Sequence, residues 1–207
     1  MIGGVEAGVL GSFALAALLI ELTPGPNMSW LAMVAATDGR RAGFASVAGV
    51  ALGLAVIGVA AAFGVAQLIA ASDLAYEVLR WAGIGFLTYL AWESWVTGSD
   101  AAGLPAPSHG AYFLKGLTTN LLNPKAAVFY VAVLPTFVDA APPVFAQTLT
   151  LTATYVAVAT LVHAGIVTAA GALEPVLNEP ARERAVRRVL AALLALVAIW
   201  FAWSTAR

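Results

Sequence analysis

The sequence predicts an all-α integral membrane protein whose six transmembrane helices form two inverted repeats of three helices each. Composition is the first observation, because 61% of the 207 residues are hydrophobic and only 10% are charged. Soluble domains have about 45–50% apolar and about 25% charged residues. The second observation is that the apolar residues fall into six long segments, and the third is that two of these segments are interrupted at prolines. Residues 1–207 are expected to form a single membrane domain.

Each segment is long enough to cross a bilayer as a helix, which takes about 20 mostly apolar residues. The predicted helices cover about residues 7–37, 44–71, 74–97, 112–138, 144–173 and 186–205. The second has no charged residue, and its Gly49, Gly53 and Gly58 would let neighbouring helices approach closely. The fifth has no acidic or basic residue other than His163. The connections are short and charged or rich in proline, and the longest is the link 98–111.

The distribution of basic residues predicts the orientation in the membrane. With six crossings, one side receives Arg40, Arg41, Lys115, Arg182, Arg184, Arg187 and Arg188. The other side receives Arg80 and Arg207. Because short cytoplasmic loops are rich in Lys and Arg, the first side is predicted to face the cytoplasm. The link 98–111 is then cytoplasmic, both termini lie outside, and the chain is a multi-pass protein of the cytoplasmic membrane.

The same topology makes the two halves of the chain inverted copies of each other. The first three helices start outside and the last three start inside, so the repeats cover about residues 1–100 and 111–207. Each repeat opens with a helix broken at a proline, within Leu22-Thr23-Pro24-Gly25 and Leu122-Asn123-Pro124-Lys125. Proline inside a helix removes a backbone donor and clashes with the preceding turn. Broken helices in corresponding positions of two halves indicate the binding site of a transporter.

Charged residues beside both breaks fall near the middle of the membrane. Glu21 precedes the first break, and Lys125 follows the second. A charge at this depth costs about 2.5–3.5 kcal/mol on insertion scales, so both side chains are expected to face the protein interior. Opposite charges would stabilise each other there, although the sequence leaves a direct pair open. A helix that starts after Pro24 or Pro124 would point the positive end of its dipole at an anion.

The other residues at the breaks have two interpretations. Pro24, Gly25 and Pro26 form either a packing kink or part of a substrate site, and the neighbouring acid favours the site. Asn27 and Asn123 either satisfy the broken backbone or bind a substrate. The two midplane charges either hold the halves together or bind the substrate. The predicted substrate site therefore comprises Glu21, Pro24, Gly25, Pro26, Asn27, Asn123, Pro124 and Lys125.

Two further residues are candidates for a proton relay that would include Glu21. His163 lies in the cytoplasmic half of the fifth helix, and histidine titrates near neutral pH. Glu93 lies towards the cytoplasmic end of the third helix. Each also has a structural interpretation, His163 as a hydrogen-bonded core residue and Glu93 as an interfacial residue. His109, in the link between the repeats, is assigned no role.

Several motifs along the chain belong together. They are Pro24-Gly25-Pro26-Asn27, Gly39-Arg40-Arg41-Ala42-Gly43, Gly49-Val50-Ala51-Leu52-Gly53 and Asn120-Leu121-Leu122-Asn123-Pro124-Lys125-Ala126. With these motifs, nearly the whole chain resembles the LysE/RhtB family of amino-acid exporters. The resemblance implies six membrane helices and export of amino acids or their relatives from the cytoplasm, driven by proton exchange. Family members often carry Asp directly after Pro-Gly-Pro, where this chain has Asn27, and we expect Glu21 to take that role.

We therefore expect a secondary active exporter, and not an enzyme, that moves a zwitterionic amino acid by proton antiport without a cofactor or metal. The substrate carboxylate would meet Lys125 or an exposed helix N-terminus. Its ammonium group would meet Glu21 or Asn123, and Glu21 would carry the coupled proton. The expected partners are this substrate, protons and the lipid bilayer, with no nucleic acid, and a homodimer stays open.

Three other functions are alternatives to amino-acid export. Export of an inorganic cation is disfavoured, because few acidic residues cluster at depth and Lys125 repels cations. An intramembrane enzyme is disfavoured, because the chain has no cysteine and no Gly-x-Ser-x-Gly, paired-aspartate or His-Glu-x-x-His motif. A structural subunit would not need two broken, charged helices. The sequence does not identify the amino acid.

Overall fold

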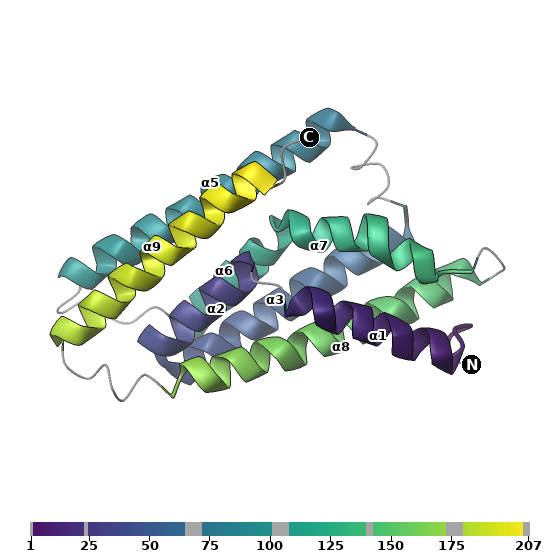
Figure 1. The fold of residues 1–207 in the computed structure, drawn as a ribbon, viewed down its shortest axis with the longest axis horizontal. Helices are drawn as coiled ribbons and strands as arrows, with labels where there is room; N and C mark the ends of the chain where they lie inside the picture. The colour runs from purple at the N-terminus through teal and green to yellow at the C-terminus, as the bar shows by residue number, and fades with distance from the viewer. Residues whose placement is uncertain are drawn as a thin grey trace.

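The computed structural model describes residues 2–22, 25–64, 72–100, 108–139, 143–172 and 180–204, and these residues form helices without a β-strand. Figure 1 shows the helices lying side by side. Their bounds are α1 Ala7–Glu21, α2 Pro26–Thr37, α3 Gly39–Ala62, α5 Asp73–Asp100, α6 His109–Leu121, α7 Pro124–Val128, η1 Phe129–Val133, η2 Leu134–Phe137, α8 Val144–Ala170 and α9 Pro180–Ser204. The predicted all-α class is confirmed.

The first predicted segment is broken where its prolines lie. α1 ends at Glu21, and α2 begins at Pro26 after a bend of 64°. Pro26 suits the first helical position, because its missing N–H would have no partner within the helix there. Gly25, with φ −167° and ψ 179°, holds the chain extended before α2 and has no side chain with which to cap it. Pro24 lies outside the described residues.

The second predicted break is also present. α6 ends at Leu121, and α7 begins at Pro124. Asn123 caps α7, because its side-chain oxygen accepts a hydrogen bond of 3.0 Å from the backbone N–H of Lys125. The helix then continues in π-helical form as η1 and in 3₁₀ form as η2. π-Helical turns are rare and occur often at functional sites.

The long helices differ from the predicted bounds mainly at their ends. α3 begins at Gly39 and absorbs most of the connection expected between residues 37 and 44. Arg40 donates a hydrogen bond of 3.0 Å to the carbonyl of Thr168 on α8. α5 extends to Asp100, so the link expected at 98–111 begins inside a helix. By length and apolar composition, α3 and α8 each qualify to span a bilayer, and α1 with α2 qualifies as one bent span, within the described ranges.

The chain runs back and forth, so the two termini lie towards the same end of the bundle (Figure 1). We call this the terminal end, and the opposite end, where α2 meets α3, the basic end. Ion pairs tie helices together at the basic end. Arg187 of α9 lies 2.8 Å from Asp38 at the end of α2, and Lys115 of α6 lies 2.5 Å from Glu93 of α5.

The helix contacts follow a reciprocal pattern between the two halves. α3 of the first half packs on α6 of the second, while α8 of the second half packs on α1 and α2 of the first. α3 also packs on α8, and α5 on α9. The contact of α3 with α6 is close, because a Cβ atom at Gly49 would clash with the Phe113 carbonyl and one at Gly116 with that of Ser46. The close approach predicted at Gly49 is therefore confirmed.

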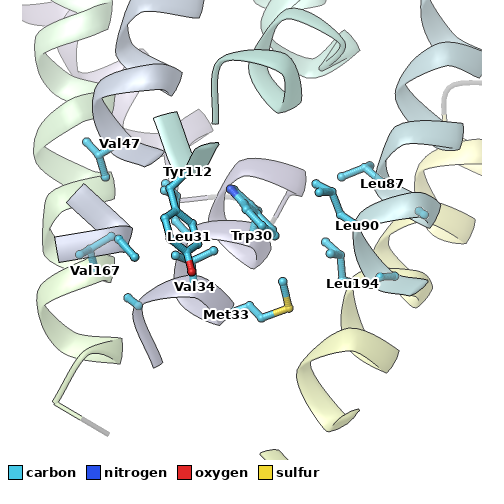
Figure 2. Close-up of a cluster of buried hydrophobic side chains, with 14 residues drawn as sticks. Trp30, Leu31, Met33, Val34, Val47, Leu87, Leu90, Tyr112, Val167 and Leu194 are labelled. Carbon is cyan, nitrogen blue, oxygen red and sulfur yellow. The ribbon is translucent and has the colours of Figure 1, made fainter. Parts of the chain in front are cut away.

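Two apolar clusters fill the interior. The terminal-end cluster joins α1, α3, α7, η1, η2 and α8, and includes Phe13, Leu54, Phe129 and Tyr155. The basic-end cluster surrounds α2, as Figure 2 shows, with Trp30 and Met33 towards Leu87 of α5 and Leu194 of α9. α1 packs in the terminal-end cluster and α2 in the basic-end cluster. The polar groups at the break between these two helices therefore lie between two apolar clusters.

Candidate functional site

A small cavity lies where the two helix breaks meet. Its volume, measured for the centre of a water-sized sphere, is about 10 Å³, which is close to the minimum for one water molecule. It is lined by Glu21, Gly25, Asn27, Met28, Asn123, Lys125, Ala126 and Tyr155. Five of the predicted site residues therefore share one cavity. Of the others, Pro26 is buried in the first turn of α2, Pro124 is the first residue of α7, and Pro24 is not described.

Glu21 is the last residue of α1, and its side chain is held by α8. It is 4% exposed. The hydroxyl of Tyr155 donates a hydrogen bond of 2.6 Å to Oε1 of Glu21. Nε2 of His163 lies 3.2 Å from Oε2, within ion-pair distance but outside hydrogen-bond geometry. A buried carboxylate of this kind is stabilised only by groups placed directly around it.

Lys125 contributes the opposite charge to the same cavity. It lies in the first turn of α7, is half-buried, and is close enough to Glu21 for the two charges to attract each other. Glu21 and Lys125, which the sequence places beside the two breaks, therefore line the same cavity. A cavity with one carboxylate and one ammonium group matches both ends of a zwitterion.

The N-terminus of α2 opens onto the cavity without a side-chain cap. Gly25 precedes it, and Gly25, Asn27 and Met28 all line the cavity. The Oδ1 atom of Asn27 is buried and has no hydrogen-bond partner among the described groups. The first N–H groups of a helix have no partners within it and attract negative charge. The arrangement thus offers an anion the start of α2 as well as Lys125.

Comparison with known proteins identifies the family of this chain. The family profile described as LysE type translocator matches residues 18–205. The chain belongs to the LysE family. This LysE-family protein is therefore a transporter and not an enzyme. No solved structure matches it.

Curated relatives cover most of the chain. The homoserine/homoserine lactone efflux protein of Salmonella typhimurium (strain LT2) is 31% identical over 193 residues, which are 90% of this chain and 92% of the relative. The protein of the same name in Salmonella typhi is 30% identical over 193 residues, which are again 90% of this chain and 92% of the relative. The leucine efflux protein of Salmonella choleraesuis (strain SC-B67) is 31% identical over 144 residues, 67% of this chain and 68% of the relative. These names support amino-acid export as the role of this LysE-family protein.

The two candidate relay residues lie in different places. His163 is 1% exposed and adjoins the carboxylate of Glu21. Glu93 instead joins α5 to α6 through Lys115, accepts a hydrogen bond of 3.3 Å from Tyr89, and does not line the cavity. The structure of this LysE-family protein thus brings His163, and not Glu93, to Glu21.

Sequence reasoning missed Tyr155, whose hydroxyl contacts Glu21 directly. A signal for it exists in the sequence, since Thr148, Thr152, Tyr155 and His163 are spaced to share one face of a helix. Met28 and Ala126 were also missed. They are apolar residues next to the predicted motifs and carry no chemical signal of their own.

Proposed function

We propose that this LysE-family translocator exports an amino acid, or a closely related zwitterion, across the cytoplasmic membrane in exchange for protons. The observation that carries the proposal is the cavity between the two helix breaks, where Glu21 and Lys125 meet. The relatives named for homoserine, homoserine lactone and leucine efflux support the substrate class.

The substrate binds with its two charged groups on different helices. Its ammonium group pairs with the carboxylate of Glu21, at the end of α1. Its carboxylate lies between Lys125 and the uncapped N-terminus of α2, where Gly25 leaves the first N–H groups open. Charge-assisted hydrogen bonds of this kind are roughly twice as strong as neutral ones, so both ends of the zwitterion contribute to affinity.

Proton exchange follows from competition at Glu21. The carboxylate binds either a proton or the substrate ammonium, because both neutralise the same buried charge. Protonation from outside releases the amino acid, and deprotonation towards the cytoplasm restores the binding form. His163, which is 3.2 Å from Oε2 of Glu21, accepts the proton on its way to the cytoplasm.

The structure corresponds to a closed state in this cycle. A cavity of about 10 Å³ does not hold an amino acid, so substrate entry requires helix movement. The ion pairs Asp38–Arg187 and Glu93–Lys115 close the basic end on two sides of α2. We assign them to a cytoplasmic gate, which gives Glu93 a gating role in place of a proton relay.

The transport cycle needs two inverted repeats of three membrane helices, with both termini outside and the basic end in the cytoplasm. The alternating path of the chain and the reciprocal helix contacts support this arrangement (Figure 1). Large apolar side chains on α5 and α9 are exposed and suit contact with lipid, among them Trp81, Trp92, Trp95, Trp200 and Trp203.

Export can be tested in cells loaded with dipeptides, which cellular peptidases convert to single amino acids. Cells that produce this protein should release the transported amino acid faster than cells that do not, and homoserine and leucine are the first candidates. Purified protein in liposomes should then couple that release to an opposite proton flux. If the protein instead confers tolerance to metal salts and exports no amino acid, the rival function in cation export would replace this one.

A further inference from the structure

Four buried polar residues of α8 form a stripe that leads from the terminal end to Glu21. Thr148, Thr152, Tyr155 and His163 are all less than a tenth exposed. Their spacing places them on one face of the helix. α8 is otherwise apolar enough to span a bilayer. Polar residues inside membrane helices are costly, and they often mark a path for ions or protons. The stripe continues beyond the cavity towards the start of α8, and substrate binding does not account for that part.

Thr152 stands out within this stripe. The hydroxyl of Thr148 donates to the carbonyl of Val144 at 2.9 Å, one turn earlier in its own helix. The Oγ1 atom of Thr152 is buried and makes no hydrogen bond of standard geometry with the protein groups that the structure describes, and the hydroxyl of Tyr130 is the polar group that lies next to it. A buried hydroxyl without a protein partner costs about 1–3 kcal/mol unless water satisfies it.

A second hydroxyl lies beside that of Thr152. A Cβ atom at Gly58 of α3 would lie 2.7 Å from Oγ1 of Thr152 and 2.8 Å from the hydroxyl oxygen of Tyr130. The absence of a side chain at Gly58 therefore lets the two hydroxyls converge. Tyr130 donates its own hydrogen to the carbonyl of Leu54 at 2.8 Å, so its oxygen can still accept a hydrogen bond. One water molecule could donate to Tyr130 and accept from Thr152.

Tyr155 connects this pair to Glu21. Its ring packs edge-on against Tyr130, with 5.5 Å between the ring centroids, and its hydroxyl donates to Oε1 of Glu21 at 2.6 Å. Thr152 and Tyr155 are three residues apart, so their Cα atoms are separated by about 4.5 Å along the axis of α8. A water molecule beside Thr152 would lie on the same face of α8 as Tyr155.

We propose that Thr152 and Tyr130 bind a water molecule that delivers protons from the terminal end to Glu21 through Tyr155. The water gives a proton to the oxygen of Tyr155 as the hydroxyl proton of Tyr155 moves to Oε1 of Glu21. Tyr155 ends the step neutral, Glu21 gains one proton, and the water is restored by a proton from outside. This inference rests on the proposed proton antiport, and it separates the outer proton path from His163 on the cytoplasmic side of Glu21.

The test compares two transport modes in liposomes that contain the purified protein. Transport driven by a pH gradient requires net proton movement, whereas exchange of labelled for unlabelled amino acid does not. Thr152→Val removes the hydroxyl and nearly keeps the shape of the side chain. We expect this variant to slow pH-driven transport about tenfold, because a hydrogen bond that stabilises the transition state of proton transfer is lost. Exchange of labelled for unlabelled amino acid should be unchanged.

Two control variants make the result specific. Thr152→Ser retains the hydroxyl and should transport like the wild type. Thr154→Val removes a hydroxyl that bonds at 2.9 Å to the carbonyl of Thr150 in its own helix, and it should also leave both modes unchanged. Equal pH-driven rates for Thr152→Val and wild type would overturn the proton route, as would an equal loss of both modes. Amino-acid transport by the wild type without proton coupling would overturn the antiport itself.

Discussion

The two helix breaks follow a similar path but differ in chemistry. At the first break, Gly25 supplies no cap, and the neighbouring acid Glu21 is held by two residues of α8. At the second break, Asn123 caps the new helix itself, and the neighbouring residue is the base Lys125. A break whose backbone is already satisfied has little to offer a ligand, whereas an uncapped one does. In the proposed function, the uncapped backbone of the first break is therefore the part that meets the substrate carboxylate.

The two charges also differ in how firmly they are enclosed. Glu21 is 4% exposed and adjoins Tyr155 and His163. Lys125 is half-buried at the start of a helix of five residues. Protons reach a buried carboxylate only through neighbouring groups, so Glu21 suits the coupling role. The more accessible Lys125 suits substrate recognition.

Replacing the acid should have the largest effect. In Glu21→Gln, the substrate ammonium loses its buried counter-charge, which costs about 3–5 kcal/mol, and we expect export from dipeptide-loaded cells to fall by more than about a hundredfold. Glu6→Gln, at an exposed carboxylate before α1, is the matched control and should export normally. Wild-type export by Glu21→Gln at equal membrane expression would remove Glu21 from the coupling role.

Replacing the base should weaken binding without uncoupling transport. We expect Lys125→Met to raise the half-saturating substrate concentration by about tenfold or more, since a hydrogen bond to a charged group contributes about 1.5–3 kcal/mol. Lys125→Arg keeps the charge and should be affected less. Proton movement per amino acid should stay at the wild-type ratio in both variants. An unchanged concentration dependence in Lys125→Met would place the base outside the site.

The contact between the halves can be tested at α3 and α6. Gly49→Ala places a methyl group against the backbone of α6 and should lower the free energy of unfolding by about 1–3 kcal/mol. Gly85→Ala on α5 is a suitable control, because nothing lies within 4 Å of the added Cβ. The midpoint of thermal unfolding in detergent measures both. Similar midpoints for the two variants would contradict the close helix contact.

The smallest expected effects distinguish the two asparagines. Asn123→Ala removes the cap of α7 and should reduce stability by about 1 kcal/mol. The Oδ1 atom of Asn27 has no partner among the described groups, so Asn27→Ala should change stability less and substrate affinity more. Thermal midpoints with and without a saturating amino acid separate the two effects. If Asn27→Ala lowered the thermal midpoint more than Asn123→Ala, the first break, and not the second, would depend on a side chain for its stability.

The sequence predicted the features that arise from local chemistry. Proline is disfavoured inside a helix but suits its first position, so the break before Pro26 and the start of α7 at Pro124 could be placed without a structure. The shared location of Glu21 and Lys125 followed from their depth in a six-helix topology. Both expectations needed only the position of each residue along its own segment.

The features that the sequence did not predict depend on how helices turn towards each other. The hydrogen bond between Tyr155 and Glu21 joins residues 134 positions apart, and it requires a particular rotation of α8. The same rotation brings His163 to Glu21, while the packing of α5 on α9 and α6 leaves Glu93 with Lys115. Charge and depth alone could not separate these two candidate relays.

Proton release on substrate binding tests the central claim most directly. In the proposed antiport, Glu21 exchanges a proton for the substrate ammonium. Calorimetric titrations of the purified protein in buffers of different ionisation enthalpy, repeated between about pH 5 and about pH 8, measure the protons released. In the range where Glu21 holds a proton, the wild type should release about one proton per bound amino acid, and Glu21→Gln should release none. Binding by the wild type without proton release at any pH, or equal release by both proteins, would contradict the account.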